Sequence, residues 1–302
     1  MNVSHEKPDV SPRSNGVINA LSFDVEDYYH VSAFANVINR GQWDEYPSRV
    51  VENTKRILDV LDQFGTRATF FVLGWVAERH PALVQEIHAR GHEVACHGYS
   101  HQLIYNQTPE VFRQETRQSQ QILEDAIGNP IRGYRAASYS ITRRSLWALD
   151  ILHDLGFRYD SSIFPVRHDR YGIPGAPRFP HNIVLGGGKK ILEFPVSTLK
   201  LGSYRLPVGG GGYFRIFPYS VIAYAISSLN KNERQPAMFY LHPWELDPDQ
   251  PRIQAGLLSR FRHYHNLGKC EQRLRKLLRD IPFTTVTKAL ERYNQPLVNI
   301  TY

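Results

Sequence analysis

Two histidines that lie four positions apart, His97 and His101, follow the apolar run Val94–Cys96 in the segment His-Gly-Tyr-Ser-His. Imidazole binds zinc, cobalt, nickel or iron, and side chains at positions i and i+4 share a face on one helical turn or in a tight helical loop. No glutamate follows His97, which excludes the HExxH helix of zinc proteases. A metal site would therefore take its remaining ligand from elsewhere in the chain. Because the chain has 13 histidines, two solvated loop histidines are the alternative.

A second group of chemically active side chains is the acidic cluster Asp24, Glu26 and Asp27, which ends the apolar run 17–23. Three carboxylates so close together repel one another, and a solvated turn or a helix N-cap would explain them without any chemistry. In α/β proteins, however, the carboxyl ends of strands are where functional side chains usually lie. We therefore treat the cluster as a candidate source of a metal ligand or a base.

The elements that would position these residues alternate regularly. Four helical patterns each end at a glycine and are followed by a short apolar run, which predicts parallel strands. The helical ranges are 49–64, 81–90, 108–127 and 142–155, and the strands that follow are 68–72, 93–96, 131–134 and 157–159. Such repetition is typical of a (β/α) barrel or a doubly wound sheet, with the site at the carboxyl ends of the strands.

Residues 165–232 interrupt this alternation with many glycines and prolines, and we expect a β-ribbon and loop insertion. The run Gly209–Gly212 lacks the Lys-Ser/Thr of a phosphate-binding loop, so we expect a flexible wall near the substrate. A helix at 218–229 and a strand at 237–241 resume the pattern. Residues 1–16 should form a flexible tail and 17–302 a single domain, in which the helical extension 250–302, with a strand at 283–286, closes the barrel.

Composition limits the class of protein. The chain of 302 residues is 42% hydrophobic and carries a formal charge of +7, but its densest basic stretch, 260–279, has the pattern of a solvated helix face. We therefore expect no nucleic-acid partner, with contact to anionic lipid as the alternative use of this helix. The chain contains no apolar run of the ~18 residues that span a membrane and no apolar signal core at its start. Its two cysteines fit a reducing compartment. We expect a cytoplasmic protein, with peripheral contact to the inner membrane as the alternative.

The polar residues that follow the expected strands together match the requirements of a metal hydrolase. A carboxylate and two imidazoles can bind an ion, a second carboxylate can take a proton from water, and a distant histidine can protonate a leaving group. Each residue alone has an ordinary structural explanation, but their joint placement at strand ends favours a site. The set is Asp24, Glu26, Asp27, His97, His101, Arg135, Asp160 and His242.

In order and type, these residues resemble the five motifs of the polysaccharide deacetylases of carbohydrate esterase family 4, over about residues 18–245. The matching segments are Ser22–Asp27, His97–His101, Tyr134–Ser138, Tyr159–Asp160 and Leu241–His242. The segments 168–172 and 242–245 resemble the branch of this family that is found in exopolysaccharide gene clusters. The resemblance implies a distorted (β/α) barrel of the polysaccharide deacetylase type with a Gly/Pro-rich insertion.

The resemblance also implies roles for single residues. Asp24 would be the general base, oriented by Arg135. His97 and His101 would bind a divalent metal ion, zinc in the first place and otherwise cobalt or nickel. His242 would protonate the departing amine, and Asp160 would hold the tautomer of His242.

Two departures from the family pattern leave questions open. Val25 separates Asp24 from the next carboxylate, so the acidic metal ligand is Glu26 or Asp27. Side chains alternate along a strand, which favours Glu26 if Asp24 points inward, although this argument weakens once the strand ends. Ala137 and Ser138 stand where proline and tyrosine are usual, which affects the expected oxyanion donor, the backbone N–H of Ser138.

The resemblance implies hydrolysis of the N-acetyl group of an amino sugar in a bacterial exopolysaccharide, a cell-wall polymer or its precursor. The partner would be an N-acetylated oligo- or polysaccharide. One alternative is an amidase that acts on a small cyclic amide or ureide, as allantoinase-like relatives do. A second alternative is a carbohydrate-binding barrel without activity, which the presence of all the ionisable site residues argues against.

Overall fold

The fold is that of an α/β protein, as predicted, in a computed structural model that describes residues 16–168 and 170–302. Most of the tail expected at 1–16 and residue Asp169 lie outside this range. The strands are β1 (Asn19–Val25), β2 (Thr69–Val72), β3 (Glu93–Cys96), β4 (Gly133–Tyr134), β5 (Tyr159–Asp160), β6 (His181–Val184), β7 (Lys190–Glu193), β8 (Thr198–Leu201), β9 (Tyr204–Pro207), β10 (Met238–Leu241), β11 (Phe283–Thr284) and β12 (Asn299–Ile300).

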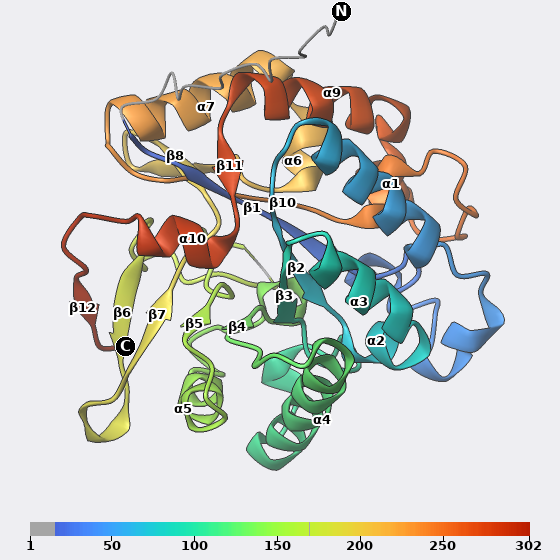
Figure 1. Ribbon diagram of the computed structural model, residues 1–302, viewed down its shortest axis with the longest axis horizontal. Coiled ribbons are helices and arrows are strands. Elements are labelled where there is room, and N and C mark those ends of the chain that lie inside the picture. The colour runs from blue at the N-terminus through green and yellow to red at the C-terminus, as the bar shows by residue number, and fades with distance from the viewer. Residues whose placement is uncertain (1–15, 169) are drawn as a thin grey trace, which may run out of the picture.

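Helices cover the outside of the strands, as Figure 1 shows for α1, α3 and α4 beside β1, β2 and β3. Helix α1, for example, buries an apolar stripe that includes Ile57, Leu58 and Leu61. The helices are α1 (Val50–Gln63), α2 (Gly74–Arg79), α3 (Pro81–Ala89), α4 (Pro109–Ile127), α5 (Trp147–Asp154), α6 (Gly211–Ile216), α7 (Tyr219–Lys231), α8 (Leu257–Tyr264), α9 (Leu267–Asp280) and α10 (Val286–Glu291).

The main sheet has the order β10-β1-β2-β3-β4-β5-β7-β6-β12, and neighbouring strands from β10 to β7 are parallel. The segment after β7 returns to β10. Ser197 donates its backbone N–H to the carbonyl of Met238 at 3.2 Å, and Tyr240 donates to the carbonyl of Gly209 at 2.7 Å. These bonds link the two ends of the parallel set into a distorted barrel and direct the carboxyl ends of β1, β3, β4 and β10 toward one mouth.

The helix and strand units predicted from sequence are confirmed, with local differences. The helix expected at 142–155 is shorter, since α5 begins at Trp147. The single helix expected over 260–279 is two helices, α8 and α9, because Asn266 adopts a left-handed conformation with φ 55° between them. Leu267, Leu274, Leu277 and Leu278 are buried on α9, as expected.

The insertion is more regular than expected. Strands β6 and β7 join the main sheet, while β8 and β9 form a separate hairpin. The glycine run is not the flexible wall that we expected, because its first three members are close-packed. A Cβ atom at Gly209 would lie 2.4 Å from the Met238 carbonyl oxygen, and one at Gly211 would lie 1.8 Å from Glu245 Oε2. These glycines are required where the chain passes against β10 and the turn that follows it.

The carboxy-terminal segment adds two strands to the main sheet. β11 pairs with β1, and β12 pairs with β6. Both cysteines, Cys96 and Cys270, are free and buried. Within the described ranges, no helix has the length and apolar character needed to cross a membrane.

Candidate active site

The acidic side chains at the carboxyl end of β1 lie in two different places. Asp24 and Glu26 line a cavity at the mouth of the barrel, whereas Asp27 faces the start of α1. The carboxylate of Asp27 accepts hydrogen bonds from the backbone N–H groups of Tyr28, Arg49 and Val50 and from Ser48 Oγ, at 2.8 to 3.1 Å. Burial raises the pKa of Asp27 despite these bonds. Asp27 thus caps a helix, and Glu26 is the carboxylate available to a metal.

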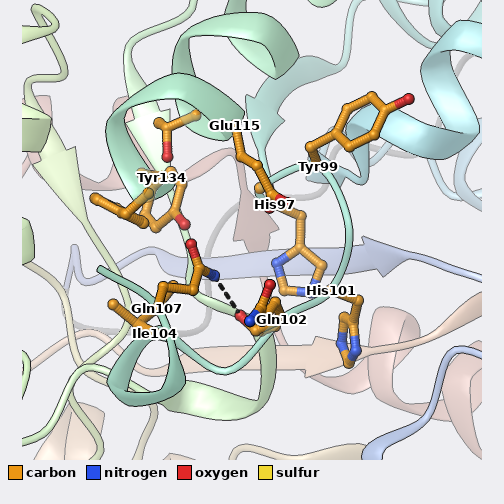
Figure 2. A pocket seen from close by; sticks show the side chains of 12 residues that line it. His97, Tyr99, His101, Gln102, Ile104, Gln107, Glu115 and Tyr134 are labelled. Carbon is orange, nitrogen blue, oxygen red and sulfur yellow. Dashed lines mark hydrogen bonds between the residues drawn. The ribbon is translucent and has the colours of Figure 1, made fainter. Parts of the chain in front are cut away.

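His97 and His101 lie in the loop that follows β3, with ring centroids 5.5 Å apart, and Figure 2 shows the two imidazoles next to each other. The pair is not on a helix, because His101 has φ 50°. His97 Nδ1 lies 2.8 Å from the carbonyl oxygen of Arg135. Donation from Nδ1 leaves the Nε2 lone pair available, and hydrogen bonds of this kind orient metal-binding histidines. Burial lowers the pKa of His97 to about 4, so the ring is neutral near pH 7.

The three side chains Glu26, His97 and His101 converge, with one potential ligand atom from each lying within 4.8 Å of the others. Glu26 Oε2 is buried and lies 2.8 Å from His101 Nε2. A carboxylate oxygen and an imidazole nitrogen that converge in this way are arranged as ligands of one ion would be. Burial opposes ionisation of Glu26, but the nearby His101 and His242 outweigh it, so the pKa of Glu26 lies below its usual range.

Arg135 follows β4 and is fully buried, with Nη1 2.6 Å from Asp24 Oδ1 and 2.9 Å from Ser22 Oγ. Its guanidinium also lies 4.0 Å from the centroid of the Phe71 ring. The ion pair with Arg135 holds Oδ1 of the Asp24 carboxylate in place. The other oxygen, Oδ2, lies 4.0 Å from His242 Nε2 and faces the cavity.

His242 follows β10, and its partner differs from the expected one. We expected Asp160 to hold this imidazole, but His242 Nδ1 lies 3.2 Å from Glu245 Oε2, which also accepts the His242 backbone N–H at 3.0 Å. Glu245 is fixed in turn by Arg215 Nε at 2.8 Å, and Arg215 donates to the carbonyl oxygens of residues 262, 263 and 265. Burial would lower the pKa of His242, but the Glu245 and Glu26 carboxylates raise it to about 9.

Asp160 instead belongs to a buried carboxyl pair. It accepts a hydrogen bond from Ser162 Oγ at 2.5 Å and lies against Glu193 on the neighbouring strand β7. Burial raises the pKa of Asp160 to about 6, and burial together with Asp160 raises the pKa of Glu193 well above its usual range. The two groups therefore share a proton near neutral pH. The pairing fixes β5 against β7 and does not reach His242.

The third motif contributes backbone strain at the cavity. Ser138 has φ 51° and Tyr139 has φ 54°, a left-handed conformation that costs of order 1–3 kcal/mol for each residue that is not glycine. Ser138 is held there by a 2.6 Å hydrogen bond between its Oγ and that of Ser32. Ser32 and Ser138 both line the cavity, so this strained turn faces the site.

The cavity that joins these groups has a volume of about 230 Å³. It contains Asp24, Glu26, His97, His101 and His242, with walls formed by residues that include Ser32, Leu103, Tyr139, Tyr171, Tyr240 and Arg262. The pocket in Figure 2, which His97 and His101 also line, has a volume of about 10 Å³ and is large enough for only about one water molecule. The larger cavity is therefore the candidate substrate site.

Three residues of this site were not assigned a role from the sequence: Glu245, Arg215 and Trp244. Trp244 stacks on His242 with ring centroids 5.0 Å apart, and its Nε1 donates to Glu26 Oε1 at 3.4 Å. The sequence pattern His-Pro-Trp-Glu could have identified Glu245 as a partner of His242. Its proline begins a helical turn, and a glutamate three residues after the cap can accept the backbone N–H of the cap residue. Arg215 is 30 residues from Glu245, and no local pattern connects them.

Comparison with known proteins relates two parts of the chain to known families. Residues 42–159 match the polysaccharide deacetylase family, and residues 161–291 match a domain of unknown function, DUF3473. A peptidoglycan-N-acetylglucosamine deacetylase of Bacillus cereus is 31% identical over 131 residues, which are 42% of this chain and 46% of that protein. A chitooligosaccharide deacetylase of Rhizobium leguminosarum bv. trifolii is 33% identical over 99 residues, or 33% of this chain and 43% of that protein.

A solved structure assigned to the polysaccharide deacetylases, from Mycobacterium smegmatis, has the same fold. Its TM-score is 0.62 at 18% identity, and the alignment covers 96% of this chain and 98% of that one. Residues 42–159 thus form a polysaccharide deacetylase domain, of carbohydrate esterase family 4. The chain spans less than half the length of the curated relatives described above. Asp24 and Glu26 precede residue 42, so their place in the site rests on the structure.

The assignment of Glu26 over Asp27 generates a first prediction. Glu26→Gln should abolish zinc binding with little change in stability, because it removes a ligand charge. Asp27→Asn should retain zinc but lower the free energy of unfolding by about 1–3 kcal/mol, the cost of leaving buried donors unsatisfied. Metal analysis of the dialysed proteins and urea unfolding measure the two effects. The opposite pattern, with zinc lost only in Asp27→Asn, would reverse the assignment.

Contact between Gly211 and Glu245 generates a second prediction. Gly211→Ala should displace the Glu245 carboxylate from His242, because the new methyl group would occupy its position. We expect kcat to fall at least about tenfold, toward the 10²- to 10⁴-fold that a general acid contributes, with zinc content retained. Gly212→Ala is the matched control, since a Cβ there meets no atom within 4 Å. Equal activity of the two variants would argue against a positioning role for Glu245.

The Asp160–Glu193 pair generates a third prediction, on the pH dependence of stability. Both carboxyls have higher pKa values in the folded chain than when unfolded, so the folded state holds more protons above about pH 4. Stability should therefore fall as the pH rises through this window, by about 1.4 kcal/mol per pH unit for each extra proton. In Glu193→Gln the fall between about pH 5 and pH 8 should be smaller than in the original chain. Urea unfolding at the two pH values measures this.

The exposed Glu291→Gln is the control for this experiment and should follow the original chain. A Glu193→Gln variant with an undiminished fall in stability would show that the pair does not share a proton.

Proposed function

We propose that this chain is a metal-dependent amidase that removes the acetyl group from an N-acetylamino sugar. The substrate would be a bacterial exopolysaccharide, a cell-wall polymer or its precursor. The observation that carries the proposal is the convergence of Glu26, His97 and His101 in a cavity that the Asp24 carboxylate and the His242 imidazole also line. The curated relatives are named as deacetylases of peptidoglycan and chitooligosaccharide, which supports the substrate class.

The donor set fits a divalent ion such as zinc, with cobalt and nickel as alternatives. Two imidazoles and one carboxylate are a common catalytic zinc set, and they leave open positions for water and substrate. When bound, the ion supplies Lewis acidity toward the acetyl carbonyl and lowers the pKa of water. Glu26 and the Nε2 atoms of His97 and His101 would hold it.

Asp24 is positioned to act as the base. Arg135 occupies its Oδ1, so Oδ2 is the oxygen that faces the cavity and can accept a proton from the attacking water. In the reaction, the water oxygen forms the new bond to the acetyl carbon, and the oxyanion that develops lies near the backbone N–H of Ser138.

His242 lies across the cavity from the histidine pair and is positioned to complete the reaction. Its Nε2 lies 3.5 Å from Glu26 Oε1 and 4.0 Å from Asp24 Oδ2, so it borders the same space as the base. An amine leaves only when its nitrogen is protonated, and the raised pKa of His242 keeps its ring charged near neutral pH. The C–N bond then breaks, acetate is released, and the proton passes from His242 to the amino group of the sugar.

Acetate release tests the proposal directly. Oligomers of N-acetylglucosamine and of N-acetylgalactosamine should be assayed with chelated protein and after addition of zinc, cobalt or nickel. We expect release only with metal. Full activity in chelated protein would contradict the metal requirement. Opening of a cyclic ureide without acetate release would favour the alternative amidase, and binding of the sugars without either reaction would favour a carbohydrate-binding barrel.

The role of His242 generates a fourth prediction. His242→Ala should lower kcat by about 10²- to 10⁴-fold on an amide substrate, the usual contribution of a general acid. The activity of the variant on an aryl acetate should fall much less, because the leaving group of this substrate departs without a proton. Both substrates should be measured on the same metal-loaded variant. Equal losses would mean that His242 supports the metal site or the fold and is not the acid.

A further inference from the structure

Helix α8 exposes an unusually apolar surface. Its side chains Leu257, Leu258 and Phe261 are 82%, 62% and 52% exposed. At about 100° of rotation per residue, these three positions fall within an arc of about 100° on one face of the helix. The opposite face is fixed to the domain, since His263 is buried and Nε2 of its ring lies 2.6 Å from Gln250 Oε1. The exposed arc is therefore a defined surface of the folded chain and not a frayed end.

Cationic side chains border this apolar arc. On the helical wheel, Arg260 and Arg262 lie on opposite sides of it, each within about 60° of its edge. Both are exposed, and neither forms an ion pair with the residues that the structure describes. Between Asp249 and Glu271 the sequence has four Lys and Arg residues, Arg252, Arg260, Arg262 and Lys269, and no carboxylate. The segment around α8 thus carries several positive charges, and no carboxylate of the same stretch of sequence offsets them.

We propose that α8 docks the chain onto the surface of a lipid bilayer that contains anionic lipids. An apolar face flanked by Arg or Lys is the pattern of helices that lie in the membrane interface, with Leu and Phe among the acyl chains and the cations at the headgroups. The proposal concerns this helix, not the solvated face of α9 that the sequence pattern indicated.

Two other occupants fit these observations less well. A soluble anionic polysaccharide would neutralise Arg260 and Arg262 but would leave the apolar arc in water. A second copy of this chain, paired by a two-fold axis through α8, would place Arg260 and Arg262 near the same residues of its partner. Like charges at such an interface oppose association. A bilayer with anionic headgroups covers the apolar side chains and neutralises the flanking cations together.

The docking surface lies beside the candidate active site. Arg262 borders the apolar arc and also lines the cavity with Asp24 and His242. In addition, Phe34, in the turn that follows Ser32 at the cavity wall, packs on His263 with ring centroids 4.7 Å apart. A docked chain would therefore hold its cavity close to the membrane surface.

Sedimentation with vesicles tests the proposal without any substrate, so the result is independent of the proposed amidase activity. The intact chain should sediment with phosphatidylglycerol–phosphatidylcholine vesicles at low salt. It should bind vesicles of pure phosphatidylcholine at least about tenfold more weakly, and high salt should reduce binding to the anionic vesicles. The triple variant Leu257→Ser/Leu258→Ser/Phe261→Ser should also bind at least about tenfold more weakly. Arg260→Gln should weaken binding without changing the apolar face.

A matched control is available in side chains with similar exposure elsewhere on the surface. Leu201, Tyr204 and Tyr224 are 52%, 62% and 66% exposed, and Leu201→Ser/Tyr204→Ser/Tyr224→Ser should bind vesicles as the intact chain does. Circular dichroism of each variant checks folding. No binding to anionic vesicles, or equal binding by the α8 triple variant, would overturn the proposal. So would light scattering that finds a dimer in the intact chain and a monomer in that variant.

Discussion

The ion pair between Arg135 and Asp24 is the interaction on which the site and the barrel both depend. The guanidinium is fully buried and lies in the middle of the strands, where it contacts β1 through Ser22, β2 through Phe71 and β10 through Met238. A buried charge is tolerated only when it is paired and hydrogen-bonded, and removal of one partner typically costs about 3–5 kcal/mol. The same contact that keeps the barrel interior stable therefore also fixes the carboxylate that we assign as the base.

Around this pair, the other charges of the site are held by partners that lie outside the cavity. Glu245 is anchored by Arg215 and fixes His242, and the Arg135 carbonyl orients His97. Trp244 lies between His242 and His263 and reaches Glu26. Because the reacting side chains are held by partners that lie outside the cavity, their cavity-facing atoms stay available for metal, water and substrate. This separation of supporting and reacting groups is what preorganised sites require.

Much of this arrangement could be predicted from the sequence, because strand ends and glycine stops are local signals. The apolar runs before Asp24, His97 and His242 located all three at one end of the sheet. The alternation of side chains beyond β1 also favoured Glu26 over Asp27, and Glu26 is the one that lies with His97 and His101. The predicted partner of His242, Asp160, was wrong, because Glu245 reaches His242 only through the way the turn after β10 packs against α6.

Two further differences have the same origin in tertiary packing. A glycine run in a sequence is compatible both with a flexible loop and with close contact between backbones, and only the contacts of Gly209 and Gly211 with β10 and Glu245 distinguish them. The helical pattern over 260–279 continues through Asn266, although the backbone turns there and leaves α8 as a separate helix. Local periodicity therefore predicted the elements but not how neighbouring elements are joined.

A crystal structure of the zinc-loaded protein, with an anomalous difference map at the zinc edge, tests the central claim most directly. The account predicts one strong peak coordinated by Glu26, His97 and His101, at ligand distances of about 2.0–2.2 Å, with Asp24 bound to Arg135 and not to the metal. A peak coordinated by Asp27, a peak outside the cavity, or no peak at saturating zinc would contradict it.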